Sequence, residues 1–362
     1  MDRSIVSDSP RRMTSALRVA IICPTFGGYG GLEAFVLTLM AGLPPTPELE
    51  VRLFFKQTVQ FELRPELTRA VAPLGPRVQF VKRGSGPLWA AIGWAQVVHG
   101  QNPSPDVVFL SKLRRRSLLI NVINHRQAGQ TWRQRCWDFA LRRADRRFYI
   151  SNFVRRTWEG EKRWPDSHVV FPICELAGDP QPPAARRGFV FAARWIANKG
   201  IDTLVEAYAQ ARLDPHTWPL RLIGDGPLRP EIERMIATRG LRGIEVLGFL
   251  SQEAKADAIR TARWMVVPPH TNEDFGLTAV EARHLRVPCV ITRDGGVPEA
   301  AGEEALSCAP GDVAGLAACL RTAAAMSEAE YSERSRRTYE TLLPQLAGPG
   351  FYATVYRELA GR

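Results

Sequence analysis

The sequence lacks any apolar run of the roughly 18–20 residues that a bilayer-spanning helix needs. Its longest apolar stretches, such as Leu17–Pro24, have the length of a buried strand. A secretory signal is missing as well. Arg11 and Arg12 precede an apolar stretch, but that stretch breaks at Pro24, runs into glycines and offers no small-residue cleavage site. We therefore expect no membrane-spanning segment, and we expect residues 1–16 to be a disordered leader.

The six cysteines are scattered, with no C-x-x-C pair and no spacing typical of metal ligands. Disulfide frameworks and structural zinc sites both need such groupings, so the sequence predicts reduced, buried thiols. Reduced thiols favour a cytoplasmic protein. Peripheral attachment to the inner face of the membrane remains open, because of the basic segment described next.

Charge is abundant but unevenly placed. The chain has 362 residues, of which 45% are hydrophobic and 23% charged, with a net charge of +11. This composition is typical of a globular protein, and the length favours two domains of roughly 150–180 residues each. Between Lys112 and Arg163 there are 15 Lys and Arg against 4 Asp and Glu, which accounts for the whole excess. A basic zone this local predicts an anionic partner on one face of one domain.

The basic zone Lys112–Arg163 is interleaved with aromatic residues. These are Trp132, Trp137, Phe148, Tyr149, Phe153, Trp158 and Trp164. Cations together with indoles favour an anionic membrane surface, where lipid-linked acceptors are found. The alternative is a solvated arginine-rich helical face with the aromatics in the core, and the sequence leaves both open. No nucleic-acid-binding motif is present, so we expect no nucleic-acid partner.

The first half of the chain alternates short apolar runs with longer mixed segments. Predicted strands are Leu17–Pro24, Val51–Phe55, Val78–Val81, Asp106–Leu110, Leu118–Ile123 and Arg147–Ile150. A helix is predicted over Leu32–Leu43, where apolar residues recur every fourth position. This alternation indicates a doubly wound parallel sheet over residues 17–176.

Gly, Pro and Ala dominate residues 177–187, which we interpret as a linker. A second α/β series follows over 188–340. Its predicted strands are Phe189–Ala193, Leu220–Ile223, Ile244–Leu247, Trp264–Pro268 and Pro288–Thr292, with helices over Gly200–Arg212 and Leu277–Arg286. The tail, from about Glu328 to Leu359, is predicted as helices, and we expect 341–362 to cross back to the N-terminal domain. Two such sheets would direct their strand ends toward a central cleft, where ligands bind.

The segment Pro268–Ala282 holds the clearest chemical signal. It places Glu273 in a strand-to-helix turn and Glu281 about two helical turns later. If the helix opens over Asp274–Thr278, its free backbone N–H groups can hold a diphosphate. The two carboxylates can accept bonds from sugar and ribose hydroxyls. A helix cap by Asp274 or Thr278 with two solvated glutamates fits the spacing equally well.

This segment resembles the Glu-x7-Glu signature of the retaining GT-B glycosyltransferases of family four, also called glycosyl transferases group 1. Phe191–Asp202 is similar to the family's strand–Arg–loop–Lys-Gly segment. Leu222–Pro227 is similar to its nucleotide-side turn, and Gly248–Leu250 to its base-side loop. Ile150–Val154 resembles the segment that closes its N-terminal domain. The resemblance covers nearly the whole chain.

The resemblance implies an α/β GT-B fold of two Rossmann-like domains. It also implies a retaining transfer of a hexose from a nucleoside diphosphate sugar to a glycan, glycolipid or lipid-linked acceptor, as in polysaccharide, lipopolysaccharide or glycoconjugate synthesis. The implied catalytic residues are Glu273, His125, Arg194 and Lys199. The implied donor contacts are Gly30, Gly31, Gly224, Asp225, Gly226, Phe249, Leu250, Phe275, Gly276, Leu277, Thr278 and Glu281.

The residues themselves support part of this interpretation. Arg194 and Lys199 are two cations flanking a strand end, well placed for phosphate oxygens, although either could equally form a surface ion pair. No DxD-like metal motif follows a suitable strand, so we expect neither a metal nor another cofactor. The glycines at 27–31 do not form a GxGxxG pattern and the second strand ends at Lys56 without an acid. An NAD(P)-dependent oxidoreductase is thus disfavoured, while a catalytically silent nucleotide-binding scaffold of the same fold remains an alternative.

Overall fold

The computed structural model describes residues 16–59, 62–129, 131–171, 176–183 and 185–361. The expected leader therefore lies outside the described residues, apart from Ala16. By its internal contacts the chain forms two compact units. Unit 1 comprises the described residues up to Ile120 together with Phe139–Arg146 and the chain from Pro349 onward, and unit 2 comprises Asn121–Asp138 and Arg147–Gly348. Each unit is described by itself.

The first sheet has seven strands in the order β3-β2-β1-β4-β5-β6-β7. The strands are β1 (Leu17–Thr25), β2 (Leu49–Gln57), β3 (Val78–Lys82), β4 (Val97–Gln101), β5 (Ser117–Val122), β6 (Arg146–Tyr149) and β7 (Ser167–Val169). The helices between them are α1 (Gly31–Ala41), α2 (Pro65–Val71), η1 (Ala72–Arg77), α3 (Gly86–Trp94), α4 (Pro105–Leu113), α5 (Trp132–Arg142) and α6 (Asn152–Glu159). The pairs β1–β2, β1–β4, β2–β3 and β6–β7 are parallel, as predicted.

One predicted strand is wrong. Asp106–Leu110 lies in helix α4, and the fourth strand of the chain is instead Val97–Gln101. Pro105 at the first turn favours a helix start, and the buried side chains of α4 (Val107, Val108, Leu110 and Ser111) lie along one helical face. Strand β4 is fully buried although it contains His99, Gly100 and Gln101. A search for continuous apolar runs therefore does not detect it.

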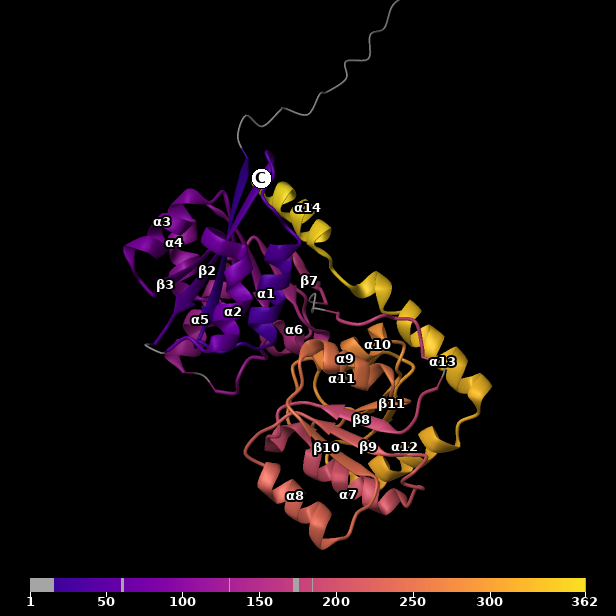
Figure 1. Ribbon diagram of the computed structural model, residues 1–362. Helices are drawn as coiled ribbons and strands as arrows, with labels where there is room; N and C mark the ends of the chain where they lie inside the picture. The colour runs from indigo at the N-terminus through magenta and orange to yellow at the C-terminus, as the bar shows by residue number, and fades with distance from the viewer. Residues whose placement is uncertain (1–15, 60–61, 130, 172–175, 184, 362) are drawn as a thin grey trace, which may run out of the picture. The chain divides into compact units, whose positions relative to one another are not determined.

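The second sheet has six strands in the order β10-β9-β8-β11-β12-β13. They are β8 (Phe189–Ala192), β9 (Leu220–Ile223), β10 (Ile244–Gly248), β11 (Trp264–Val267), β12 (Cys289–Thr292) and β13 (Leu306–Cys308). The intervening segments are η2 (Ala197–Lys199), α7 (Ile201–Ala211), α8 (Arg229–Thr238), α9 (Gln252–Arg260), α10 (Leu277–His284), α11 (Val297–Ala301) and α12 (Val313–Ala325). All five of its pairings are parallel. Helices cover both faces of this sheet (Figure 1).

Both sheets share the strand order 3-2-1-4-5-6 of a doubly wound fold, which confirms the predicted fold class. The order reverses between the first and fourth strands of each sheet, that is, between β1 and β4 and between β8 and β11. Ligands of such sheets bind beyond the carboxyl ends of the strands at this reversal point. In the second sheet, the ends of β8 and β11 are the ones that precede Arg194 and Glu273.

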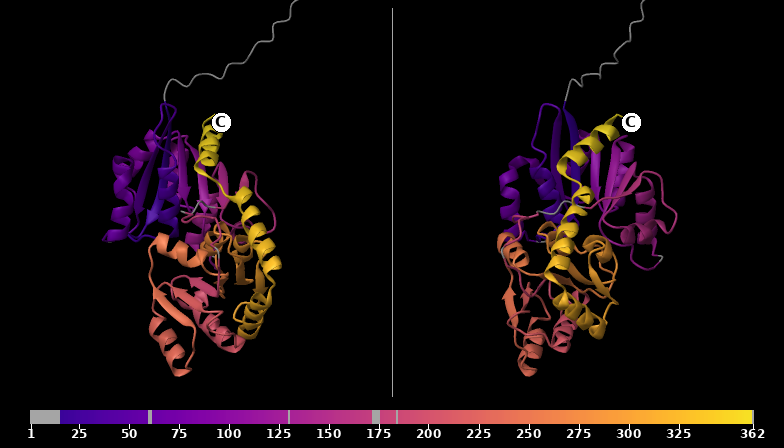
Figure 2. Two further views of the ribbon diagram at one scale, coloured as in Figure 1. Left: turned by 45° about the vertical axis from the view of Figure 1, so that its right-hand side comes forward. Right: turned by 90° about the vertical axis from the view of Figure 1, so that its right-hand side faces the viewer.

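The tail is helical, as predicted: α13 (Glu328–Glu340), η3 (Leu343–Gln345) and α14 (Pro349–Ala360). Helix α14 belongs to unit 1, where it packs against β1 and β4 and buries Tyr352 and Tyr356 (Figure 2). The hydroxyl of Tyr356 lies 2.7 Å from Nδ1 of the fully buried His99. No helix among the described residues is long and apolar enough to cross a membrane.

The thiols largely follow the prediction. Cys23, Cys289 and Cys308 are free and buried, and Cys319 is free and half-buried. Burial raises the pKa of Cys23 and, to about 12, that of Cys289. Cys136 is the exception, because it is exposed on α5, so burial was wrongly expected there. Cys174 lies outside the described residues.

Candidate functional site

The loop after β8 carries Arg194 and packs on the turn after β9. Gly224 has φ +118°, and a Cβ there would lie 1.9 Å from the carbonyl oxygen of Ala193. A Cβ on Gly226 would lie 2.5 Å from the carbonyl oxygen of Trp195, whose ring is fully buried. Glycine is therefore needed at both positions because two backbones meet there. The Gly-Asp-Gly turn thus fixes the course of the loop that presents Arg194.

The turn after β9 also contacts the end of β10. The N–H of Gly224 donates to the carbonyl of Gly248 at 2.8 Å. Asp225 at the tip of the turn is exposed, and the side chain of Phe249 just beyond β10 is 82% exposed. Leu250 beside it is half-buried. An aromatic ring left this open at a strand end offers a flat apolar surface to a ligand.

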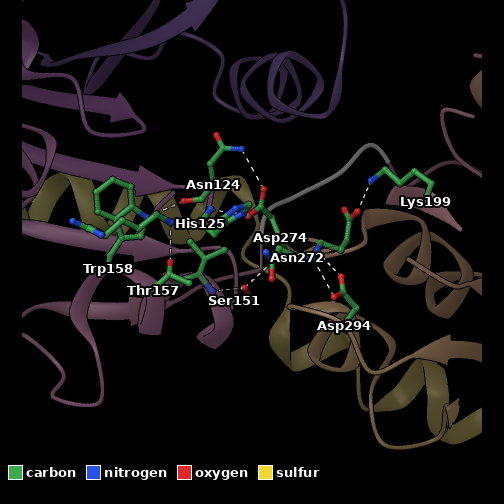
Figure 3. Close-up of polar contacts among 12 residues, drawn as sticks. Asn124, His125, Ser151, Thr157, Trp158, Lys199, Asn272, Asp274 and Asp294 are labelled. Atoms are coloured by element: carbon green, nitrogen blue, oxygen red, sulfur yellow. Dashed lines mark hydrogen bonds and ion pairs between the residues drawn. The ribbon is translucent and has the colours of Figure 1, made fainter. Parts of the chain in front are cut away.

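Lys199 and Glu273 form an ion pair between the loop after β8 and the loop after β11 (Figure 3). Their side chains are 23% and 15% exposed. Gly200 keeps the two loops together, since it has φ +68° and a Cβ there would lie 1.9 Å from the carbonyl oxygen of Pro268. Both sequence-predicted residues thus lie on adjacent strand ends and contact each other directly.

Arg194 differs from Lys199. Its side chain is exposed, and within the described part of the chain its guanidinium makes no hydrogen bond or ion pair. A guanidinium is always charged and presents a planar fork of donors. Arg194 is therefore an open cation at the carboxyl end of β8.

A third loop, after β12, holds the Glu273 backbone in place. The carboxylate of Asp294 accepts from the N–H of Asn272 at 3.0 Å and from that of Glu273 at 2.7 Å (Figure 3). The N–H of Gly296 donates to the carbonyl of Glu273 at 2.8 Å. Gly295 has φ +54°, and a Cβ there would lie 1.9 Å from that same carbonyl oxygen. Sequence reasoning missed these three residues, although a Gly-Gly pair two residues after a buried strand was a usable signal.

Asp274 bonds His125, which follows β5 (Figure 3). One carboxylate oxygen of Asp274 accepts from the backbone N–H of His125 at 2.6 Å and lies 2.8 Å from its Nδ1. The other oxygen accepts from the amide of Asn124 at 3.3 Å. The Ser151 hydroxyl donates to the Asp274 carbonyl at 2.8 Å. His125 is thus brought to the residue next to Glu273, although 149 positions separate it from Asp274.

Helix α10 begins two residues later than a cap by Asp274 would require. Its first residue is Leu277 and its N-cap is Gly276, with φ 93° and no capping hydrogen bond from any described side chain. Capping by Asp274 or Thr278 was therefore the wrong alternative. Leu277 and Thr278 form the first turn, where backbone N–H groups lack helical partners. Phe275 is buried, with its ring centroid 4.7 Å from that of Phe171, so its side chain serves packing.

Glu281 lies on α10 and pairs with Lys255 on α9. Lys255 Nζ is 2.9 Å from Oε1 of Glu281, while Oε2 is buried and has no hydrogen-bond partner among the described residues. Burial raises the pKa of Glu281, and the charge and hydrogen bond of Lys255 act against that rise. Sequence reasoning did not identify Lys255.

Gly30 and Gly31 belong to unit 1. Gly30 is the N-cap of α1, and its N–H donates to Oε2 of Glu33 at 3.2 Å. The Thr25 hydroxyl donates to the other oxygen of Glu33 at 3.3 Å. Glu33 is therefore a first-turn helix residue, and burial raises its pKa. Gly31 is the exposed first residue of α1.

The geometry can be compared with known proteins. Residues 186–325, which contain the second sheet and the loops described above, match the family model of glycosyl transferases group 1. This part of the chain is similar to the group 1 glycosyltransferases. It is 34% identical over 110 residues to an uncharacterized glycosyltransferase of Methanocaldococcus jannaschii, a match that covers 30% of each chain. It is 27% identical over 197 residues to O-antigen chain mannosyltransferase C of Escherichia coli, which covers 50% of this chain and 52% of the relative.

The chain thus spans about half or less of the curated relatives it matches. Over the whole chain the similarity is to a fold. The crystal structure of the Anabaena protein HepE in complex with UDP and glucose has a TM-score of 0.74 and 14% sequence identity. That match covers 95% of this chain and 99% of the other. Together with the two doubly wound sheets, this shows the GT-B fold.

Unit 2 brings most of the predicted residues to three neighbouring loops. Arg194, Lys199, Glu273 and the Gly224–Gly226 turn lie there, with His125 attached through Asp274. Glu281 faces α9. The binding and catalytic roles of these residues remain predictions. Among the described residues, no group of three or more His, Cys, Asp and Glu side chains is placed to hold a metal ion.

Proposed function

We propose that the chain transfers a hexose from a nucleoside diphosphate sugar to a hydroxyl of a glycan, glycolipid or lipid-linked acceptor, with retention of the anomeric configuration. The observation that carries this proposal is the uneven pairing of two cations on one loop: Lys199 is engaged by Glu273, whereas Arg194 is open. An open guanidinium at the reversal point of a doubly wound sheet fits the phosphates of a donor nucleotide.

Chemically, the bond between the anomeric carbon and the diphosphate oxygen must break, leaving added negative charge on the diphosphate. Arg194, Lys199 and the free N–H groups at the start of α10 stabilise that charge in our proposal. The acceptor oxygen bonds to the anomeric carbon on the same face, and its proton passes to the departing phosphate. Glu273, held by Asp294 through backbone bonds, positions the sugar, so that no enzymic nucleophile is needed.

Support for the donor and acceptor classes comes from the similar proteins. HepE was solved with UDP and with glucose, and the E. coli relative is described as an O-antigen chain mannosyltransferase. We propose the same ligand classes for this chain, namely a nucleotide-sugar donor and a glycan-type acceptor of the cell envelope.

The test is a transfer assay with UDP-, GDP-, ADP- and TDP-sugars and simple glycan acceptors, with the anomeric configuration of the product read by NMR. We expect one nucleotide sugar to be consumed and its configuration to be kept. Arg194→Ala and Lys199→Ala should each lower turnover about 100-fold, as loss of a charge-stabilising group does elsewhere. Arg242→Ala, which removes an exposed cation elsewhere in unit 2, serves as the control. An inverted product would contradict the retaining mechanism, and no consumption of any donor would leave a nucleotide-binding scaffold.

Metal independence is part of the proposal, because two cations and a helix terminus can neutralise the leaving diphosphate. Activity should persist in EDTA. If it disappears in EDTA and returns with manganese, this part of the account is wrong.

We further propose that an anionic membrane surface is a partner of the basic zone Lys112–Arg163. Helix α5 exposes Trp132 and Phe139, at 74% and 58%, together with Arg135, and the exposed Arg143 follows its last residue. The Arg143 guanidinium lies 4.7 Å from the centroid of the Phe139 ring. Exposed aromatics alternating with arginines match a headgroup interface, in which cations meet phosphates and rings enter the interfacial layer.

Sedimentation with liposomes tests this partner. Wild type should pellet with anionic vesicles and stay in the supernatant with neutral ones, and Trp132→Ser together with Phe139→Ser should weaken pelleting. Leu343→Ser, which removes an exposed apolar side chain elsewhere, is the matched control. Equal recovery in both supernatants would remove the idea.

A further inference from the structure

The carboxylate of Asp274 determines how the ring of His125 is presented. Both side chains are partly exposed, at 25% and 30%. His125 is held at two points, because its backbone N–H and its ring Nδ1 both contact the same carboxylate oxygen of Asp274. The Phe153 ring lies beside it, with centroids 6.0 Å apart. Figure 3 shows the side chain of Asp274 next to that of His125.

Hydrogen-bond chemistry then fixes the proton. An ionised carboxylate only accepts, so a ring nitrogen bonded to it at 2.8 Å must carry the hydrogen. In the neutral imidazole the other nitrogen, Nε2, is then an acceptor. Nε2 of His125 makes no hydrogen bond with any residue that the structure describes. In the neutral ring Nε2 is therefore an acceptor, whose partner must donate, as a hydroxyl does and a phosphate oxygen does not.

We propose that Asp274 is a positioning residue: it holds neutral His125 in the Nδ1–H tautomer and so directs an acceptor, Nε2, toward a hydroxyl of the sugar bound at the Glu273 loop. The identity of the ligand rests on the proposed function, whereas the tautomer does not. Partner groups of this kind orient histidines in other sites and are important for function without touching the substrate.

Ser151 separates this role from a merely structural one. Its hydroxyl also holds Asp274, but through the backbone carbonyl, and it leaves the carboxylate untouched. If Asp274 only anchors its loop, Ser151→Ala should reproduce the effects of Asp274→Ala. If the carboxylate orients the ring, the two variants should differ.

The experiment is nitrogen NMR of the full chain with 15N-labelled histidine, the His125 signals being assigned by their loss in His125→Gln. In wild type near neutral pH we expect a protonated Nδ1 and an unprotonated Nε2. Asp274→Ala should shift the signals toward the Nε2–H tautomer, and Ser151→Ala should leave them unchanged. Asp257→Asn, which removes a carboxylate that is 70% exposed on α9, is the charge control. An Nε2–H tautomer in wild type, or the same signals in wild type and Asp274→Ala, would overturn the proposal.

Turnover gives the second readout. Asp274→Ala should lower kcat/KM for the donor about 10–100-fold, while Ser151→Ala lowers it much less. Equal losses in the two variants would contradict a role for the carboxylate. If the tautomer is as proposed but no donor is turned over, the proposed function fails and the positioning role stands. If a donor is turned over but His125 is not in the Nδ1–H tautomer, the positioning role fails and the proposed function stands.

Discussion

Single side chains at the site differ in how their charge is balanced. Glu281 is the most buried of the predicted site carboxylates, and only one of its oxygens has a partner, Lys255. Because burial raises its pKa, the proton is held more tightly in the folded protein than in the unfolded chain. The stability that this group contributes is therefore present at low pH and is lost as the pH rises through the raised pKa.

Comparing wild type with Glu281→Gln in urea unfolding across acid to neutral pH tests this sign. The amide mimics the protonated acid and does not titrate. We expect wild type to lose stability relative to the variant as the pH rises through the raised pKa. Parallel stability curves would show that the Glu281 carboxyl titrates alike in the folded and unfolded chains.

Asp294 offers a second residue-scale prediction. Its nearly buried carboxylate satisfies two backbone N–H groups of the Glu273 loop. Asp294→Ala removes the acceptor of both N–H groups, which should cost about 1–3 kcal/mol of unfolding free energy for each group. The substitution also releases the loop that bears Glu273. We expect a lower melting temperature and a large fall in turnover. Asp179→Ala, on an exposed loop of the same unit, is the control. Unchanged turnover would show that Glu273 does not need this support.

At the scale of elements, hydrophobic periodicity predicted most of what is seen. Five of the six strands of the second sheet were predicted, because buried parallel strands are mostly continuous apolar runs. The three-residue strand β13 was not predicted. Strand β4 was missed because His99 and Gln101 are polar, and only the folded chain supplies their bond to each other and the bond of His99 to Tyr356 on α14. The bond between His125 and Asp274 was equally hidden, since nothing local in the sequence reports a contact across 149 positions.

Loop contacts yield a prediction about glycine. Gly295 combines a positive φ with a close approach to the Glu273 carbonyl. Gly295→Ala should lower the unfolding free energy by at least about 1–2 kcal/mol through the backbone conformation alone. The new Cβ would also displace the loop, because it would clash with the Glu273 carbonyl oxygen. We expect reduced thermal stability with reduced turnover. Gly311→Ala, also at positive φ but with open space around its Cβ, is the matched control, and it should lose stability without losing turnover. Equal turnover losses in the two variants would remove the role assigned to the contact.

At the scale of the whole molecule, the end of the chain completes unit 1. Helix α14 buries Tyr352, Tyr356 and Leu359 and bonds the buried His99 through the Tyr356 hydroxyl. Tyr356→Phe keeps the ring and removes the hydroxyl, and with it the hydrogen bond to Nδ1 of the buried His99. We expect a loss of about 0.5–1.5 kcal/mol in unfolding free energy. Tyr339→Phe, on a half-buried ring of α13, is the control. No difference between the two would show that the bond to His99 contributes nothing to stability.

The proposed function requires unit 2 to bind a nucleoside diphosphate sugar through Arg194 and Lys199, with Glu281 as a further predicted donor contact. The most direct measurement is the shift in melting temperature produced by UDP-, GDP-, ADP- and TDP-sugars in wild type, Glu281→Ala, Lys199→Ala and the control Arg242→Ala. The account predicts that one nucleotide stabilises wild type and Arg242→Ala, and that the effect is lost in the other two variants. Stabilisation by none of the four, or stabilisation that survives both substitutions, would contradict it.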